Sequence, residues 1–297
     1  MEEHSSPCVC SGIRFCAKCR DTLRVQQLFS GSVFLSSASS VIEKQWHNDR
    51  LSSCSFAIIG KSTLSYCIEC MTIFKSEAPI KSCVDHQGAI STSVVISGLV
   101  VFQDVLTEEE ETALIYYLDN SHPFPPWKES QSGRRKQDYG PKRNFKKKKV
   151  RPAEIPAMPL ALEPVCAIIS STTENFTGRA YRIAEVSALE YVEGKMSNFD
   201  PHIDDTWLWG DRIAGLNLNE PCVVTFVEPD GVCCDVYLPR RSFFLMSGNC
   251  RYKWMHGIRP EHVRGRRISL TFRELSDEIL ADAGTSEVVL SAASTFV

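Results

Sequence analysis

Short β-branched runs separated by turn residues dominate the second half of the chain. Gly, Pro, Asn or Asp stands between most of them, and runs of this length and composition predict β-strands. The seven runs are YRIAEVSALEYV (181–192), RIAGLNLNE (212–220), CVVTFVEP (222–229), VCCDVYL (232–238), SFFLMSG (242–248), YKWMHGI (252–258) and ISLTF (268–272). So many short strands favour a mainly β fold with flanking helices, either a sandwich or a jelly roll.

A strand and then a helix are predicted upstream of this region. The run VVISGLVVFQDVL (94–106) is rich in β-branched residues and is interrupted by a glycine. Thr107 then precedes EEEETALIYYLDN (108–120), and Glu110 stands three residues after Thr107. Because a Thr and a Glu at this spacing can each accept the other's backbone N–H, the pair predicts the start of a helix. The buried face of this helix would consist of Leu114, Ile115 and Leu118.

Outside these elements the pattern is weaker. The Ser-rich stretch 30–40 is typical of a linker, residues 41–90 show no clear period, and VCAII (165–169) predicts a second helix. The chain is therefore divided into a Cys-rich N-terminal segment (1–92) of unassigned structure, a principal domain (93–278) and a peripheral C-terminal tail (279–297).

Composition fits a water-soluble protein. The 297 residues, 43% hydrophobic and 23% charged, can bury one large core or two smaller ones. The apolar stretch SVVISGLVVF is far too short to cross a bilayer, and the start MEEHSSPC lacks the apolar core of a signal peptide. We expect no membrane partner, and a monomer located in the cytoplasm and nucleus.

Three residues have the spacing of a metal site. His202 and Asp204 stand two apart in DPHIDDTWLWG (200–210), and His256 follows 52 positions after Asp204. Because side chains alternate along a strand, the first two can reach one ion from the same face. Two imidazoles and one carboxylate leave three positions of an octahedron open, which is typical of non-haem Fe(II) oxygenases. A bare H-x-D pair also occurs by chance, so a metal site requires further support from the sequence.

That support comes from two arginines. Arg267 and Arg273 flank ISLTF and are six positions apart, so they share a face of the predicted strand. A dianionic 2-oxo acid requires a planar, forked cation, and arginine provides one.

The arrangement HIDD…HGI…RISLTFR resembles the AlkB family of Fe(II)/2-oxoglutarate dioxygenases. Four segments are similar to one branch, the AlkB homologue four subfamily: CVCSGIRFCAKC (8–19), QSGRRKQDYGPK (131–142), DPHIDDTWLWG (200–210) and RRISLTFREL (266–275). The resemblance is dense from about Ser97 to Asp277 and at the N-terminus, and thin between Arg20 and Ile96.

The resemblance implies a double-stranded β-helix, a distorted jelly roll with the metal at its open mouth, over residues 93–278. Fe(II) would be held by His202, Asp204 and His256. The cosubstrate 2-oxoglutarate and O₂ would take the open positions, with ascorbate as a further reductant.

The resemblance also implies roles for residues around 2-oxoglutarate. Arg267 would pair with its far carboxylate, while Arg273 would support its near end or Asp204. Tyr191 would donate its hydroxyl, although an ordinary strand aromatic is the alternative. Leu189 stands where much of the family has Asn, so that contact would be missing.

The implied reaction is oxidative N-demethylation with release of formaldehyde. The favoured substrate is methyl-lysine in a protein such as actin, and the alternative is N6-methyladenine in DNA. A second alternative is a non-catalytic binding protein on an oxygenase fold, against which the intact triad and both arginines argue.

The thirteen cysteines are better explained as reduced thiols and metal ligands than as disulfides. Cys8, Cys10, Cys16 and Cys19 could close a structural zinc site or remain free thiols. A second set, C-x₂-C-x₁₂-C-x₂-H, has suitable ligand types, and nothing in the family resemblance predicts it. It consists of Cys67, Cys70, Cys83 and His86.

Residues 134–151 hold ten Lys or Arg against one acid, Asp138. Such a segment can bind DNA, dock an acidic protein, or simply be a solvated face. The candidate residues on the substrate side are Arg134 and Arg135, which resemble part of a lid, together with Asp205, Trp207 and Trp209. The two tryptophans would share a face, where they could line a pocket or pack in the core.

Overall fold

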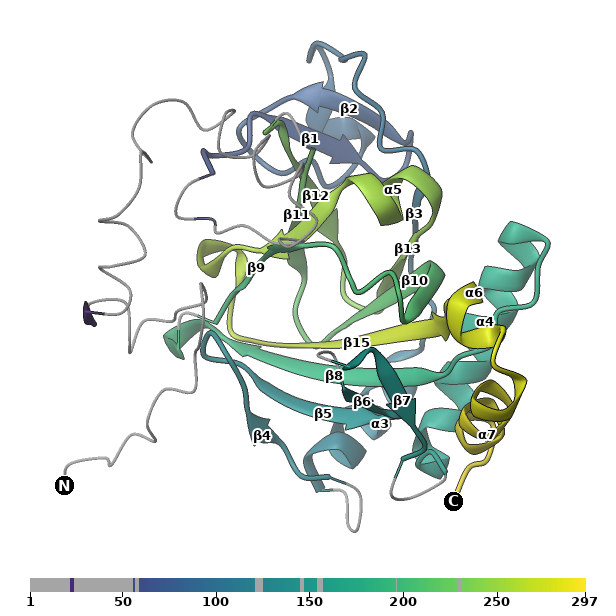
Figure 1. Ribbon diagram of the computed structural model, residues 1–297. Helices are drawn as coiled ribbons and strands as arrows, with labels where there is room; N and C mark the ends of the chain where they lie inside the picture. The colour runs from purple at the N-terminus through teal and green to yellow at the C-terminus, as the bar shows by residue number, and fades with distance from the viewer. Residues whose placement is uncertain are drawn as a thin grey trace, which may run out of the picture.

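The structure is a computed structural model that describes residues 22–23, 56, 59–120, 125–144, 147–153, 157–195, 197–228 and 231–297. Two large β-sheets form the body of the molecule (Figure 1). In order, the six-stranded sheet contains β2 (Thr72–Lys75), β1 (Leu64–Cys67), β12 (Cys233–Leu238), β11 (Cys222–Val227), β14 (Met255–Ile258) and β9 (Phe199–His202). The seven-stranded sheet contains β3 (Leu99–Phe102), β13 (Ser242–Met246), β10 (Trp209–Leu218), β15 (Arg266–Leu275), β8 (Glu185–Val192), β5 (Arg135–Tyr139) and β4 (Lys128–Glu129).

The remaining elements surround the sheets. A hairpin is formed by β6 (Lys142–Asn144) and β7 (Lys149–Arg151). The α-helices are α3 (Glu108–Asn120), α4 (Glu163–Thr177), α5 (Gly248–Lys253), α6 (Asp277–Leu280) and α7 (Ala283–Ala293). Short 3₁₀ turns cover Cys83–His86, Leu160–Leu162, Glu193–Lys195 and Pro260–His262. None of the helices described is long and apolar enough to span a membrane.

The two sheets pack face to face as a jelly roll, which confirms the predicted fold. Tyr66 and Phe226 of the six-stranded sheet share one buried cluster with Ile213 and Phe244 of the seven-stranded sheet. A second cluster lies between the seven-stranded sheet and the helices on its outer face (Figure 1). Its members include Leu118 of α3, Ile169 of α4 and Leu270 of β15.

Alternation along β15 separates structural from chemical side chains. Ile268, Leu270 and Phe272 belong to the cluster beneath the helices. Because successive side chains point to opposite faces, Arg267 and Arg273 face the other sheet. The predicted common face of the two arginines is therefore present.

The helix prediction from Thr107 is confirmed in detail. The Thr107 N–H donates to Glu110 Oε2 at 2.8 Å, and the Glu110 N–H donates to Thr107 Oγ1 at 3.1 Å. Leu114 and Leu118 of α3 are buried. The helix predicted at VCAII is part of α4.

Three regions differ from the sequence-based expectation. Strands β1 and β2 extend the six-stranded sheet on the N-terminal side of residue 93, and β1 pairs with β12 in parallel. The beginning of YKWMHGI is helical, because α5 runs to Lys253 before β14 starts. The tail is packed rather than peripheral: Val289 and Leu290 of α7 are buried.

Candidate metal centre

His202, Asp204 and His256 converge at one edge of the six-stranded sheet. His202 is the last residue of β9, and it lies opposite His256 in the register of β9 and β14. Asp204 follows two residues after the strand ends. One ligand atom from each of the three lies within 4.8 Å of the others, and His256 Nε2 is 3.9 Å from Asp204 Oδ2.

The polar contacts leave the donor atoms available. His202 Nδ1 is 3.0 Å from the carbonyl oxygen of Asp200, which directs Nε2 of the ring elsewhere. Asp204 Oδ1 accepts a hydrogen bond from Arg273 at 2.9 Å. Asp204 Oδ2 is buried and has no hydrogen-bond partner among the described residues. A buried, unpaired carboxylate oxygen needs a cation, so this donor set fits a bound metal ion.

The electrostatics keep the donors in their metal-binding forms. Burial alone would raise the pKa of Asp204, but the Arg273 guanidinium and the two imidazoles outweigh it and hold the pKa below its usual range. Burial lowers the pKa of His256 to about 4, although Asp204 opposes this effect. At neutral pH the site therefore offers an ionised carboxylate and a neutral His256, the forms that coordinate Fe(II).

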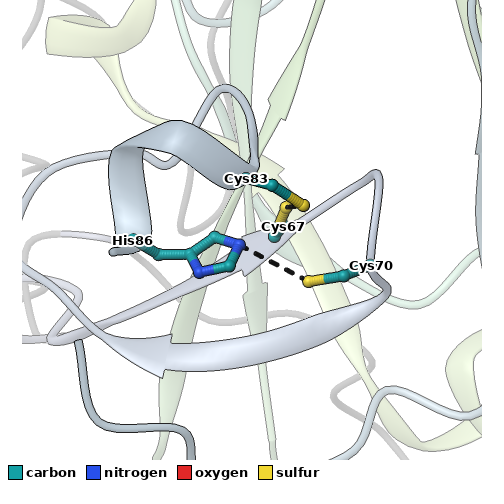
Figure 2. Close-up of side chains that lie close together, drawn as sticks. All are labelled: Cys67, Cys70, Cys83 and His86. Carbon is teal, nitrogen blue, oxygen red and sulfur yellow. Dashed lines mark hydrogen bonds between the residues drawn. The ribbon is translucent and has the colours of Figure 1, made fainter. Parts of the chain in front are cut away.

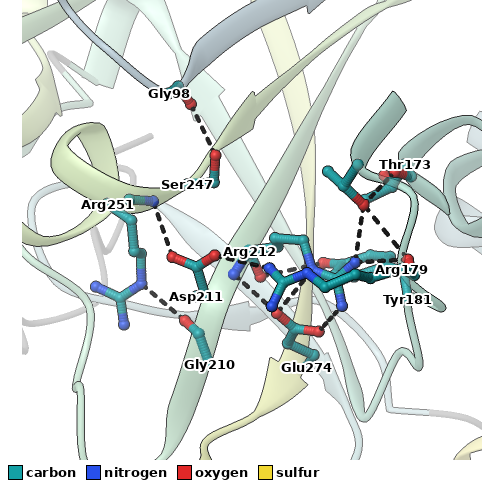
Figure 3. Close-up of polar contacts among 12 residues, drawn as sticks. Gly98, Thr173, Arg179, Tyr181, Gly210, Asp211, Arg212, Ser247, Arg251 and Glu274 are labelled. Carbon is teal, nitrogen blue, oxygen red and sulfur yellow. Dashed lines mark hydrogen bonds and ion pairs between the residues drawn. The ribbon is translucent and has the colours of Figure 1, made fainter. Parts of the chain in front are cut away.

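Arg251 of α5 fixes the backbone that carries Asp204. This arginine is buried, and its guanidinium donates to the carbonyl oxygens of Asp204 (3.1 Å), Trp209 (3.3 Å) and Gly210 (3.1 Å). Figure 3 shows Arg251 reaching Gly210. Arg251 could not be predicted from the sequence, because no local spacing links it to a loop 47 positions earlier.

Arg267 is placed to receive an anion. It is 1% exposed, its Nε donates to Asn217 Oδ1 at 2.6 Å, and its Nη1 has no partner among the described residues. Its guanidinium lies 4.9 Å from the centre of the Tyr191 ring, opposite it in the register of β15 and β8. A buried guanidinium with unused N–H groups suits a carboxylate ligand.

Arg273 is instead bound to the Asp204 carboxylate. Besides Asp204, it contacts Glu185 Oε2 at 3.1 Å. The sequence left two roles open for Arg273, contact with the near end of 2-oxoglutarate or with Asp204. The geometry fits the contact with Asp204.

A family model described as the 2OG-Fe(II) oxygenase superfamily matches residues 98–273. The chain belongs to this superfamily. Within it, the chain is an AlkB-family member. It is 34% identical over 94% of its length to a Caenorhabditis elegans protein named DNA N6-methyl adenine demethylase, 90% of which is covered. It is also 34% identical to mouse and 35% identical to human alkB homolog 4, over 67% and 61% of this chain and 75% and 68% of theirs. Among solved structures, OsALKBH1 aligns with a TM-score of 0.46 at 12% identity, over 60% of this chain and 98% of that one.

Membership makes the protein an Fe(II)- and 2-oxoglutarate-dependent dioxygenase, which uses O₂. The donor atoms of His202, Asp204 and His256 fit Fe(II). The Arg267 Nη1, which has no partner among the described residues, fits a carboxylate of 2-oxoglutarate.

Arg134 of this oxygenase lies near His202, with the Phe199 ring between them. Its guanidinium stacks 3.7 Å from the centre of the Phe199 ring, and Phe199 stacks 4.0 Å from His202. Arg134 is 2% exposed, and its Nη1 has no partner among the described residues. Arg135, in contrast, forms an ion pair with Glu190 on the adjacent strand.

The other candidates on the substrate side occupy different environments. Trp207 and Trp209 are buried with Leu208, Leu275 and Leu290, so the core interpretation describes them better. Asp205 is exposed and lies after the end of β9 rather than on a strand. Its carbonyl oxygen accepts the N–H groups of Leu208 and Trp209, and this turn replaces the expected strand geometry.

The N-terminal cysteines Cys8, Cys10, Cys16 and Cys19 lie outside the described residues.

Proposed function

We propose that this dioxygenase removes methyl groups from nitrogen, with N6-methyladenine in DNA as the first substrate to test. The observation that carries the proposal is the convergence of His202, Asp204 and His256, with a buried Asp204 Oδ2 that has no hydrogen-bond partner among the described residues. The name of the C. elegans relative, which aligns over 94% of this chain, supports the methylated base.

The residues of the chain would divide the work as follows. His202, Asp204 and His256 would hold Fe(II), which with 2-oxoglutarate and O₂ supplies the oxidising power to hydroxylate an N-methyl carbon. Arg267 would anchor the far carboxylate of 2-oxoglutarate, and Tyr191 would pack against that arginine. Arg273 and Arg251 would keep Asp204 in position. The hydroxymethyl amine that results would lose formaldehyde.

A methylated base must leave the stack to reach such a site. The Phe199 ring is covered by Arg134 on one face and by His202 on the other, so it offers no open face for stacking. A base would instead meet the Arg134 guanidinium, whose Nη1 has no partner among the described residues.

Methyl-lysine in a protein such as actin is the second candidate, and the basic segment favours it. Arg134 is buried, while Arg135 and Arg143 are ion-paired with Glu190 and Glu185. These arginines are thus committed to contacts within the chain, which leaves fewer free charges for phosphates. The exposed lysines that remain in this segment could contact an acidic protein surface.

The test is formaldehyde release by purified protein with Fe(II), 2-oxoglutarate, O₂ and ascorbate. The substrates are duplex and single-stranded oligonucleotides with one N6-methyladenine, and a methyl-lysine actin peptide together with folded actin. Unmethylated versions serve as controls. Formaldehyde from the oligonucleotides alone supports the first candidate, and from actin alone the second. Formaldehyde from neither, with no succinate formed, would favour a binding protein on an oxygenase fold.

A further inference from the structure

A second cluster of metal-binding side chains lies far along the six-stranded sheet from the triad. Cys67 ends β1, Cys70 follows in the turn to β2, and Cys83 and His86 belong to the 3₁₀ turn Cys83–His86. One ligand atom from each of the four lies within 4.8 Å of the others. Figure 2 shows the three sulfur atoms and the imidazole directed toward a common centre.

Two of the six ligand–ligand distances match the edges of a coordination tetrahedron, and all six are within 4.8 Å. Zinc bonds of about 2.3 Å to sulfur and about 2.0–2.1 Å to nitrogen put two sulfurs about 3.8 Å apart, and a sulfur and a nitrogen about 3.6 Å apart. The Cys67 and Cys83 sulfurs are 3.8 Å apart, and the Cys70 sulfur is 3.6 Å from His86 Nε2. The sulfur separation is also far above the disulfide bond length of about 2.05 Å.

Neighbouring groups hold the four ligands in these positions. His86 stacks on Phe74 with ring centres 3.9 Å apart and planes 16° from parallel. The Cys83 N–H donates to the carboxylate of Glu69 at 2.7 Å. Contacts of this kind orient ligands around protein-bound metals.

The turn that carries Cys70 is also strained in the absence of a constraint. Met71 has a φ of 53°, a left-handed conformation that costs a residue with a side chain about 1–2 kcal/mol. The side chain of Met71 is exposed, so packing does not hold it there. A metal bound by Cys67 and Cys70 would close this turn.

We propose that Cys67, Cys70, Cys83 and His86 bind one zinc ion. Three thiolates and one imidazole in a tetrahedron select Zn²⁺, whereas the His-Asp-His site selects Fe(II). Because the protein fills all four positions, the ion is structural and has no open position for substrate.

The position of the cluster defines what the zinc stabilises. It ties β1 and β2 to the following turn, and β1 pairs in parallel with β12. The Ser62 hydroxyl donates to Asp235 Oδ1 at 2.7 Å and strengthens that join. The same sheet carries His202 and His256 on β9 and β14, so the zinc closes the edge opposite to the iron ligands.

The first test measures zinc per chain by mass spectrometry of metals in the full-length protein. Cys83→Ser and His86→Ala should each lose one equivalent of zinc, while Cys166→Ala, a buried thiol in α4, should lose none. The same variants in a background with Cys8, Cys10, Cys16 and Cys19 replaced by serine separate this site from the N-terminal cysteines. Unchanged zinc in both backgrounds would overturn the proposal.

A second measurement on the unmutated site covers variants that fail to fold. Co²⁺ exchanged into the protein with serines at the four N-terminal positions should give the thiolate charge-transfer band and the visible bands of a tetrahedral ion. Absence of these bands, iron in place of zinc, or a Cys67–Cys83 disulfide in protein purified without reductant would each overturn the proposal. Iron content and formaldehyde release are measured in separate experiments. A protein that releases no formaldehyde can therefore still show zinc at this cluster, and the two proposals can fail independently.

Discussion

At the scale of single residues, the two carboxylate oxygens of Asp204 have different environments. One of its oxygens is paired with Arg273 and the other has no partner among the described residues. A carboxylate with a buried, unpaired oxygen lowers the stability of a folded protein. Packing of the fold therefore does not by itself explain Asp204. A cation held by Asp204, His202 and His256 would remove that cost.

We therefore expect Asp204→Ala to abolish both iron loading and turnover. His202→Ala should do the same, because each removes one of three protein ligands. Metal analysis and succinate formation measure the two effects, and circular dichroism checks that the fold is retained. Glu287→Ala, which alters an exposed carboxylate of α7, is the matched control. Full iron occupancy in Asp204→Ala would show that the ion binds elsewhere.

Arg267→Ala should raise the KM for 2-oxoglutarate by roughly 100-fold. Two charge-assisted hydrogen bonds to a buried carboxylate contribute about 3 kcal/mol, which corresponds to that factor. Arg267→Lys should recover only part of the loss, because an ammonium group cannot form the forked pair. The measurement is initial rate against 2-oxoglutarate concentration. If both variants keep the parental KM, Arg267 is structural and another arginine holds the cosubstrate.

Single residues also show where the sequence is informative. Arg267 and Arg273 could be predicted because period-two spacing is a local property, and they share a face of β15. The H-x-D pair and His256 could be predicted from donor chemistry and the family resemblance, because Asp204 lies beyond the end of β9 and strand alternation does not place it. Arg251 and Asn217 could not, because their partners are set by pairing between distant strands.

At the scale of elements, strand identity was predictable where alternation and turn residues coincide, as in β8, β10 and β15. Several short pieces were not. β1 and β2 have four residues each; β1 pairs in parallel with a strand about 170 positions away, and β2 pairs only with β1 at the edge of the sheet. The helix α5 precedes β14 inside one apolar run, and periodicity cannot separate the two over so few residues.

Glu190 of strand β8 forms ion pairs with arginines on both neighbouring strands, Arg135 of β5 and Arg266 of β15. Burial would raise its pKa, but hydrogen bonds from Arg135 and Arg266 outweigh it and lower the pKa below the usual value. A carboxyl group with a lowered folded-state pKa contributes stability above its unfolded pKa of about 4.3, and the contribution disappears as the pH falls through the folded-state value.

Glu190→Gln should therefore lower the free energy of unfolding by about 2 kcal/mol at pH 7, the contribution of hydrogen bonds to a charged group. The difference between the two proteins should shrink as the pH falls below about 4.3. Urea denaturation across this pH range measures it, with Glu287→Gln as the exposed control. A difference that stays constant with pH would mean that the carboxylate charge is not responsible.

At the scale of the whole molecule, the two ends of the described chain are integrated into the oxygenase fold. The six-stranded sheet includes β1 and β2, which precede residue 93. The boundary expected at residue 93 therefore cuts through this sheet's set of strands. The C-terminal segment closes the other side. The Met158 N–H donates to the Thr295 carbonyl oxygen at 2.7 Å, and the Val297 N–H donates to the Met158 carbonyl oxygen at 3.0 Å.

Leu290→Ala in α7 should accordingly destabilise the protein by about 3 kcal/mol, as expected for a large-to-small change in a core. Leu290 is 5% exposed and packs with Trp207 and Trp209. Val288→Ala on the same helix is the matched control, because Val288 is 51% exposed. Thermal and urea denaturation compare the two. Equal effects would return the C-terminal segment to the peripheral role expected from the sequence.

The overall charge of −3 does not reveal that basic residues are concentrated in the segment 134–151. The partner of this segment can be tested with its exposed lysines. Lys147, Lys148 and Lys149 are exposed, unlike the arginines that precede them. If these lysines contact DNA phosphates, replacing all three with Gln should flatten the dependence of log affinity on log salt by up to about 2.7, at about 0.9 per phosphate contact.

Binding of a fluorescent N6-methyladenine duplex across a salt series measures this slope. A triple Gln substitution at Lys61, Lys75 and Lys253, exposed lysines elsewhere in the chain, should leave it unchanged. If the partner is an acidic protein surface, DNA affinity should be weak at physiological salt, and the same lysine substitutions should mainly slow association with that protein. A steep slope that the Lys147–Lys149 variant leaves intact would place the phosphate contacts elsewhere on the oxygenase.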